Sequence, residues 1–247
     1  MKIGAYGLRT LGSWSGRQLL LSLAFCLALV SWPSVALANT YYSYSENTDG
    51  QQYLGAFGTW QNSNMNLADY SNGQFIASVL WLYVQPDSSQ WVEVGLRNSY
   101  EADVCNCVAY SAFWADTDRD GAPLYVHTIA NTSPDGSSHN YEVQRASNPT
   151  YWNVYRDYNY VGQSTIMSGT LGYYHDTGGE IYLTSSLGPQ AHSNTFDMYS
   201  ESKNTSGNWY YWYSHVGLIN NGCGSYPQGY CLNGYAYYNY EWSWNKP

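Results

Sequence analysis

Two glutamates lie at equivalent positions in two short runs that alternate apolar and polar residues. Side chains alternate between the two faces of a strand, so the apolar positions of each run predict a core face. Glu93 falls on the opposite face beside Trp91, and Glu180 falls on the opposite face beside Tyr182. Two carboxyl groups that share a cleft can divide the roles of acid and base when their surroundings separate their pKa values. We therefore take Glu93 and Glu180 as candidate catalytic residues, with Trp91 and Tyr182 as candidate substrate-binding residues; two unrelated solvent-facing glutamates would give the same pattern.

A further acidic motif has the spacing of a calcium loop. The sequence from Asp116 to Gly121 reads D-x-D-x-D-G, with carboxylates also at Asp118 and Asp120. The twelfth position of such a loop is His127 here rather than glutamate, and the flanking residues have the composition of strands rather than helices. These departures exclude an EF-hand. A calcium-binding hairpin loop and a metal-free acidic turn are both compatible with the motif.

The histidines do not form a metal-binding pattern. No H-x-H or H-E-x-x-H spacing occurs, and no G-x-S-x-G nucleophile elbow is present. His175 and Asp176 precede Glu180, where they either tune its carboxyl group or, as we expect, form a turn. We predict no metal and no other cofactor.

The cysteines favour disulfide bonds. After the first 38 residues the sequence contains Cys105, Cys107, Cys223 and Cys231. An even number of cysteines in an exported chain is typical of disulfides, and four cysteines allow three pairings. A bond within C-x-C would close a small, strained ring, which favours Cys223–Cys231 or bonds between the two clusters. The spacing does not match a zinc site.

Residues 1–38 have the organisation of an export signal. Three basic residues flank or precede an apolar run over 19–30, and an A-x-A cleavage site ends at Ala38. The apolar run is shorter than the roughly 20 residues that a membrane-spanning helix requires. We expect cleavage before Asn39 and a secreted protein, extracellular or periplasmic, that has no membrane anchor.

Composition excludes several classes of protein. Charged residues make up only 11% of the 247 residues, whereas about 25% is ordinary. Aromatic residues make up 18%, with 28 Tyr and 11 Trp, which argues against disorder. The net charge of −9, which becomes −12 without residues 1–38, argues against a nucleic-acid partner.

Short strand-like runs follow one another over residues 39–247, at a spacing near ten residues and with Gly, Asn, Asp and Ser turns between them. This spacing is typical of an all-β antiparallel β-sandwich or jelly roll, and we predict one such domain and a monomer. Two of the runs, 141–145 and 152–157, are predicted to form a hairpin. The full set of predicted strands is 55–60, 75–84, 90–97, 109–115, 124–129, 141–145, 152–157, 171–175, 180–185, 196–202, 209–212 and 235–244.

The two glutamate motifs resemble those of known glutamic peptidases. Glu93-Val94-Gly95-Leu96 resembles the Glu-Ala-Gly-Trp element of the neprosin type and the Gln-Thr-Gly-Val element of the fungal eqolisins. Gly178-Gly179-Glu180-Ile181 is similar to the Gly-Gly-Glu-Val element around the second neprosin-type glutamate. The motifs occur in the family's order, the similar region spans about residues 55–200, and Trp152 is a candidate for the tryptophan between them. A Thr-x-Met-Gly-Ser-Gly-like element is absent, and leucine replaces the tryptophan of the first motif.

The resemblance implies a concave sheet on which Glu93 and Glu180 face each other across a cleft for a protein or peptide substrate. One carboxyl group would activate water, and the other would protonate the leaving amine or stabilise the oxyanion. Such chemistry requires one protonated carboxyl group, so activity at acid pH is expected. The resemblance leaves open which glutamate is the base, because a close pair titrates jointly.

Two other functions fit the same residues. Jelly-roll glycosidases of the small-xylanase kind also place two glutamates on a sheet lined by Tyr and Trp. A non-catalytic, lectin-like module would use the rings to stack on sugar. The ring-rich stretch 235–242 is likewise either a strand that covers an apolar edge or a glycan-stacking surface.

Overall fold

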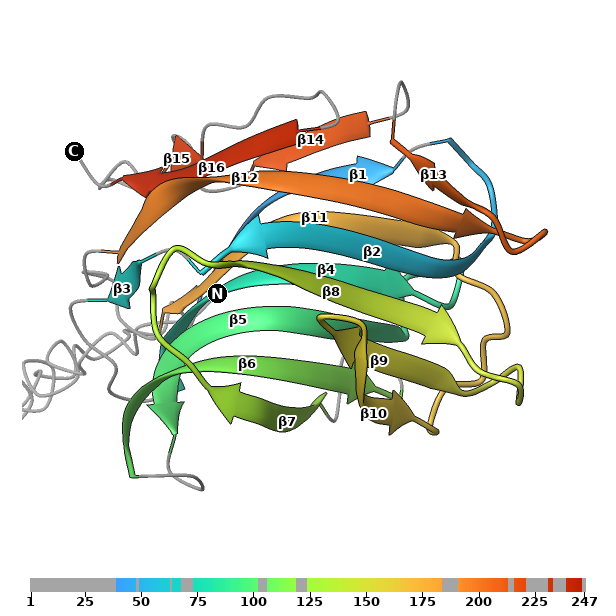
Figure 1. Ribbon diagram of the computed structural model, residues 1–247, viewed down its shortest axis with the longest axis horizontal. Helices are drawn as coiled ribbons and strands as arrows, with labels where there is room; N and C mark the ends of the chain where they lie inside the picture. Colours follow the sequence, from blue (N-terminus) through green and yellow to red (C-terminus); the bar gives the residue numbers. More distant parts are fainter. Residues whose placement is uncertain are drawn as a thin grey trace, which may run out of the picture. The chain divides into compact units, whose positions relative to one another are not determined.

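The described part of the chain is built from antiparallel strands. The computed structural model describes residues 39–47, 49–62, 64–67, 73–101, 106–118, 124–183, 191–212, 216–220, 231–232 and 239–245. Within these ranges there are strands and turns but no α-helix, so no helix there is long enough to cross a membrane. The all-β prediction is confirmed, and the strands form the two sheets of a sandwich (Figure 1).

The first sheet has seven strands, and their order in the sheet differs from their order in the sequence. Its order is β14 (Val216–Asn220), β1 (Asn39–Asn47), β11 (Tyr174–Leu183), β4 (Phe75–Tyr83), β5 (Trp91–Glu101), β6 (Cys107–Thr117) and β7 (Leu124–Asn131). The central position of β4 brings β5 and β11, which lie far apart in the sequence, to either side of one strand.

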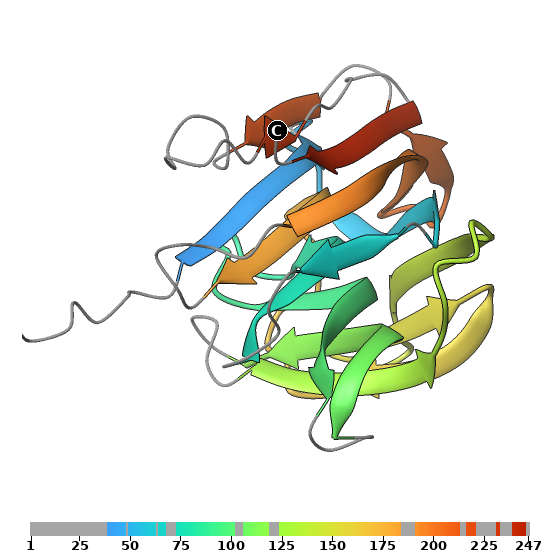
Figure 2. The same cartoon turned by 90° about the vertical axis from the view of Figure 1, so that its left-hand side faces the viewer.

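The second sheet has nine strands. Seven follow the order β10 (Asn159–Ser164), β9 (Trp152–Arg156), β8 (Ser138–Arg145), β2 (Tyr53–Gln61), β12 (Ala191–Asn204), β16 (Asn239–Asn245) and β15 (Cys231–Leu232). The short strands β3 (Met65–Leu67) and β13 (Trp209–Tyr211) also pair with β12. The side view in Figure 2 shows the two sheets as separate layers.

The main hydrophobic core fills the space between the sheets. Leu80 of β4 and Val94 of β5 come from one sheet, and Tyr141 of β8 and Val154 of β9 come from the other; all four side chains are fully buried. The core face predicted for the strand of Glu93 is confirmed, because its apolar residues all belong to this core: Val92, Val94 and Leu96.

The face of the seven-stranded sheet that points away from the core is also apolar. A second buried cluster lies there, formed by Ala77, Val79, Trp81, Phe113 and Ala115. Partly buried aromatic side chains of β1, β4 and β5 pack against the cluster: Tyr44, Phe75, Tyr83 and Trp91. β4 is therefore covered on both faces, which explains why its sequence is apolar almost throughout.

The predicted hairpin is confirmed, because β8 and β9 pair with Arg145 opposite Trp152. The strand predictions were wrong in the parts of the chain that form β11, β1 and β10. Residues 171–175 and 180–185 were predicted as separate strands with a turn between them, but β11 runs unbroken through His175, Asp176 and the two glycines that follow. β1 and β10 were not predicted, because their sequences are mostly polar.

Gly95 allows β4 and β5 to approach closely beside Glu93. A Cβ atom added to Gly95 would overlap the carbonyl oxygen of Ser78 and lie 2.9 Å from the Cα of Val79. Because both obstacles are backbone atoms of a central strand, they cannot move aside without disturbing the sheet.

We therefore expect Gly95→Ala to lower the unfolding free energy by about 1–3 kcal/mol, the usual range for overpacking. Urea unfolding at pH 4 measures this change, with Val126→Ala on the exposed edge strand β7 as a control that should stay within about 0.5 kcal/mol of the parent. Equal stability of Gly95→Ala and the parent would show that the two strands can separate at no cost.

Candidate active site

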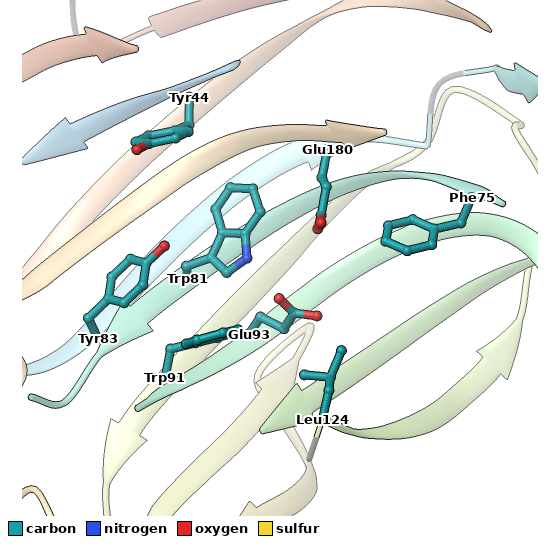
Figure 3. A pocket seen from close by; sticks show the side chains of 8 residues that line it. All are labelled: Tyr44, Phe75, Trp81, Tyr83, Trp91, Glu93, Leu124 and Glu180. Atoms are coloured by element: carbon teal, nitrogen blue, oxygen red, sulfur yellow. The ribbon is translucent and has the colours of Figure 1, made fainter. Parts of the chain in front are cut away.

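The register of three neighbouring strands places Glu93 and Glu180 on one face of the sheet. On one side of β4, Glu93 of β5 pairs with Trp81. On the other side, Glu180 of β11 pairs with Ala77. Both glutamates are therefore on the outer face, four residues apart along β4, and Figure 3 shows their carboxyl groups pointing toward each other beside the Trp81 indole.

A cavity of about 160 Å³ opens between the two glutamates. Aromatic side chains make up most of its wall, and the full lining is Tyr44, Phe75, Trp81, Tyr83, Trp91, Glu93, Leu124 and Glu180 (Figure 3). The sequence-based pairing of Glu93 with Glu180 thus corresponds to one shared cavity.

Burial controls the protonation of Glu93. Only 6% of this residue is exposed, and loss of hydration raises the pKa of its carboxyl group from 4.5 to about 7. A hydrogen bond from the Trp81 indole, the nearby Trp91 indole and the positive charge of Arg97 act in the opposite direction and lower the pKa. Desolvation is the largest of these effects, so Glu93 keeps its proton under acid conditions.

Arg97 brings a positive charge to the same face. It lies opposite Ala77 on the β5 side, in the same row across the sheet as Glu180 on the β11 side. Its guanidinium group lies over the Phe113 ring, 5.1 Å from the ring centre. The charge of this cation lowers the pKa of Glu93, although less than burial raises it.

The two predicted substrate-binding residues have different positions. Trp91 lines the cavity, its ring centre lies 6.1 Å from that of Tyr83, and its indole N–H is buried without a hydrogen bond of ordinary geometry to the described residues. Tyr182 does not line the cavity. It stacks on Phe75 at 5.7 Å and supports that wall residue from behind.

Asp176, which the sequence analysis placed in a turn or beside Glu180, lies on this face, together with Glu46, which the sequence did not indicate. Asp176 and Glu46 face each other across β11 and β1, and Asp176 is 2% exposed. Burial, the charge of Glu46 and a partly opposing hydrogen bond from Tyr83 leave the pKa of Asp176 well above its usual value. Burial and these two acidic groups also raise the pKa of Tyr44 to about 12. Asp176 lies four residues before Glu180, and this spacing puts both side chains on one face of a continuous strand. The prediction of a turn at this point prevented the sequence analysis from using that spacing.

Several sequence-based assignments lie outside the cavity. Trp152 is fully buried in the core between the sheets and donates its indole N–H to the Gly169 carbonyl, so it does not line the cleft. His175 is a buried core residue bonded to Ser202, and burial lowers its pKa to about 3. It is neither a turn residue nor a neighbour of the glutamate pair.

The acidic motif is only partly described. Asp116 is buried at the end of β6, 3.6 Å from His127, and Asp118 follows it, whereas Asp120 lies outside the described residues. In the described ranges no group of three acidic, His or Cys side chains is arranged to hold a metal. Cys105 and Cys223 also lie outside these ranges, so the disulfide pairing stays a prediction.

Comparison with solved structures relates this fold to glutamic peptidases. Scytalido-glutamic peptidase with a transition-state-analogue inhibitor aligns with a TM-score of 0.56 at 9% identity, over 84% of this chain and 99% of that one. SCP-B, an eqolisin bound to the tripeptide Ala-Ile-His, aligns with a TM-score of 0.54 at 10% identity over the same shares. At these identities the likeness shows a shared fold. No protein-family model and no curated protein sequence matches the chain.

We expect the unfolding free energy to fall as the pH rises from 4 to 8. A carboxyl group whose pKa is raised by folding stabilises the folded state fully below its unfolded pKa of 4.5, and this contribution is lost as the pH rises through about 7. For Glu93 the difference amounts to about 3 kcal/mol, and burial of Asp176 acts in the same direction. Urea unfolding across this range should show a shallower pH dependence for Glu93→Gln; an unchanged dependence would contradict the burial of an ionisable Glu93.

Proposed function

We propose that the chain is a secreted, acid-active endopeptidase that hydrolyses peptide bonds with Glu93 and Glu180. One observation carries the proposal: the two carboxyl groups point toward each other across one aromatic-lined cavity, in a fold shared with eqolisin peptidases. The export signal in residues 1–38 and the acidic composition support a site of action outside the cell. The aromatic walls suit apolar stretches of an extended peptide.

The different surroundings of the two glutamates support a division of roles. Glu93 is buried and retains its proton up to a pH near 7, so it donates a hydrogen bond to the carbonyl oxygen under attack. Glu180 is half-buried at the mouth of the cavity and acts as the base. It takes a proton from water as the water oxygen bonds to the carbonyl carbon. When the tetrahedral intermediate collapses, Glu180 returns the proton to the departing amine nitrogen and the C–N bond breaks.

Arg97 is proposed to position the charges of the pair. Its field favours the ionised state of nearby carboxyl groups, which lets a carboxylate persist at acid pH beside a second carboxyl group. Its contact with Phe113 holds the cation at the side of the cleft, so it is a positioning residue that leaves room for substrate.

Glu93→Gln and Glu180→Gln should each reduce casein hydrolysis. We expect a loss of at least about a hundredfold for Glu180→Gln, because the amide cannot accept the proton of water. Glu93→Gln keeps one hydrogen-bond donor, so we expect a smaller loss, of about tenfold or more, and a weaker dependence on pH above 5. The parent should be active at acid pH, lose activity as the pH rises through about 7, and resist both pepstatin and chelators.

Asp87→Asn is the matched control, since this exposed turn carboxylate lies outside the cavity and should leave cleavage unchanged. Absence of casein cleavage by the folded chain at every pH would contradict the peptidase proposal. Hydrolysis of xylan or β-glucan by that same chain, lost in Glu180→Gln, would assign the pair to glycoside hydrolysis instead.

Arg97→Gln should move the alkaline limb of the pH–activity profile upward by about one pH unit, because loss of the cation raises the pKa of Glu93 further. Arg97→Lys retains the charge and should restore most of the parental profile. The profile of kcat/KM between pH 2 and 8 measures this effect. A uniform loss of activity with an unmoved limb would show that Arg97 acts only through its packing on Phe113.

A further inference from the structure

A second group of aromatic and acidic residues lies on the outer face of the nine-stranded sheet. Tyr141 and Val143 of β8 point into the core. Because side chains alternate along a strand, Glu142 and Gln144 point outward. On this side of the sheet, between β13 and β10, lie six rings that we call the outer tyrosine patch: Phe57, Tyr155, Tyr158, Tyr160, Trp209 and Tyr211. This patch and the glutamate cavity occupy different sheets.

The rings of the outer tyrosine patch are arranged around a buried floor. Phe57 is 7% exposed, and the Tyr158 ring stacks above it at 6.2 Å with an interplanar angle of 20°. Trp209 meets Phe57 edge-on at 6.1 Å, and Tyr160 meets Tyr155 at 6.0 Å. Tyr158 and Tyr160 remain 71% and 59% exposed, so their upper surfaces are open to a ligand.

The backbone that presents Tyr158 is strained. Asp157 and Tyr158 form the turn between β9 and β10 with φ values of 51° and 61°, a region that bulky residues rarely adopt. Turns of this kind favour glycine at the second position. Tyrosine at position 158 therefore opposes local stability, and its exposed ring gains little from burial. A surface role accounts for the residue better than a structural one does.

Polar groups lie among the rings. Glu142 sits between Phe57 and Tyr155 in one row across the sheet, is 7% exposed, and its Oε1 atom has no hydrogen-bond partner among the described residues. Burial raises the pKa of Glu142 to about 7. Lys203 donates to Gln144 and lies 5.4 Å from the Trp209 ring centre. A ligand over the rings would meet donors and acceptors at their edges.

We propose that the outer tyrosine patch binds a neutral polysaccharide. A sugar ring presents an apolar C–H face, which stacks on tyrosine and tryptophan, and a rim of hydroxyl groups, which bonds to Glu142 and Gln144. The net charge of −9 disfavours nucleic acid and anionic membranes. A protein partner is disfavoured because Glu142 and Lys203 lie among the rings, whereas the centres of protein interfaces are depleted of such charges.

Retention of the secreted chain on microcrystalline cellulose, insoluble xylan and chitin tests the proposal. We expect binding to at least one of these, and at least tenfold weaker binding by the double variant Tyr158→Gly/Tyr160→Ala. Glycine accepts the φ of position 158, so the double variant should keep the parental Tm or exceed it. Tyr125→Ala, which removes an exposed tyrosine (45%) from β7 of the other sheet, is the control and should bind like the parent.

The proposal is independent of the glutamate pair, so Glu93→Gln/Glu180→Gln should retain full binding to the polysaccharide. Loss of binding in that variant would place the sugar in the cavity and overturn the proposal. Failure to bind all three polysaccharides, or equal binding by Tyr158→Gly/Tyr160→Ala, would overturn it as well. A parental dimer that becomes monomeric in the double variant, seen by analytical ultracentrifugation without polysaccharide, would assign the face to a second copy of the chain.

Discussion

Desolvation of the Glu93 carboxyl group is the constraint on which the proposed chemistry depends. The surrounding rings of the seven-stranded sheet deprive this group of water, and Trp81 and Arg97 only partly compensate, so the proton is retained up to a pH near 7. The register in which β4 pairs with β5 and β11 then determines which residues lie near the proton of Glu93. Trp81 pairs with Glu93, and four residues away along β4 Ala77 pairs with Glu180. A protonated group and a candidate base thus share one cavity without needing a metal to separate their charges.

In the sandwich, the residues that stabilise the fold lie apart from the residues that are proposed to bind or react. Its main core lies between the sheets, so the outer face of each sheet can carry residues that do not optimise stability. The cavity face holds buried carboxyl groups that are neutral under acid conditions, which links the pH of greatest stability to the pH of proposed activity. The opposite outer face carries the strained turn at Tyr158. If both faces function as proposed, the chain binds a polysaccharide with the nine-stranded sheet and cleaves peptides with the seven-stranded sheet.

Strand alternation was enough to place Glu93 and Glu180 on non-core faces, because Val92, Val94 and Ile181 mark the core side clearly. The alternation fails on β4, where both faces are covered and the sequence is apolar almost throughout, so Trp81 and Tyr83 could not be assigned to the site. A turn was predicted between strands at 171–175 and 180–185, yet β11 continues through this segment and buries Asp176. The register across three strands depends on long-range pairing that no local pattern encodes. It decides that Trp91 reaches the cavity while Tyr182 lies behind Phe75.

The most direct test is a titration of the glutamate carboxyl groups by carbon-13 NMR, on the folded chain labelled at the glutamate side-chain carboxyl carbon. We expect two resonances with midpoints near pH 7, one of which disappears in Glu93→Gln and moves upward in Arg97→Gln. Glu142 shares a raised pKa of about 7, so Glu142→Gln is needed to assign the remaining resonance. A Glu93 resonance that titrates near 4.5, the ordinary value, would show that the carboxyl group is hydrated and would contradict the proposed division of roles.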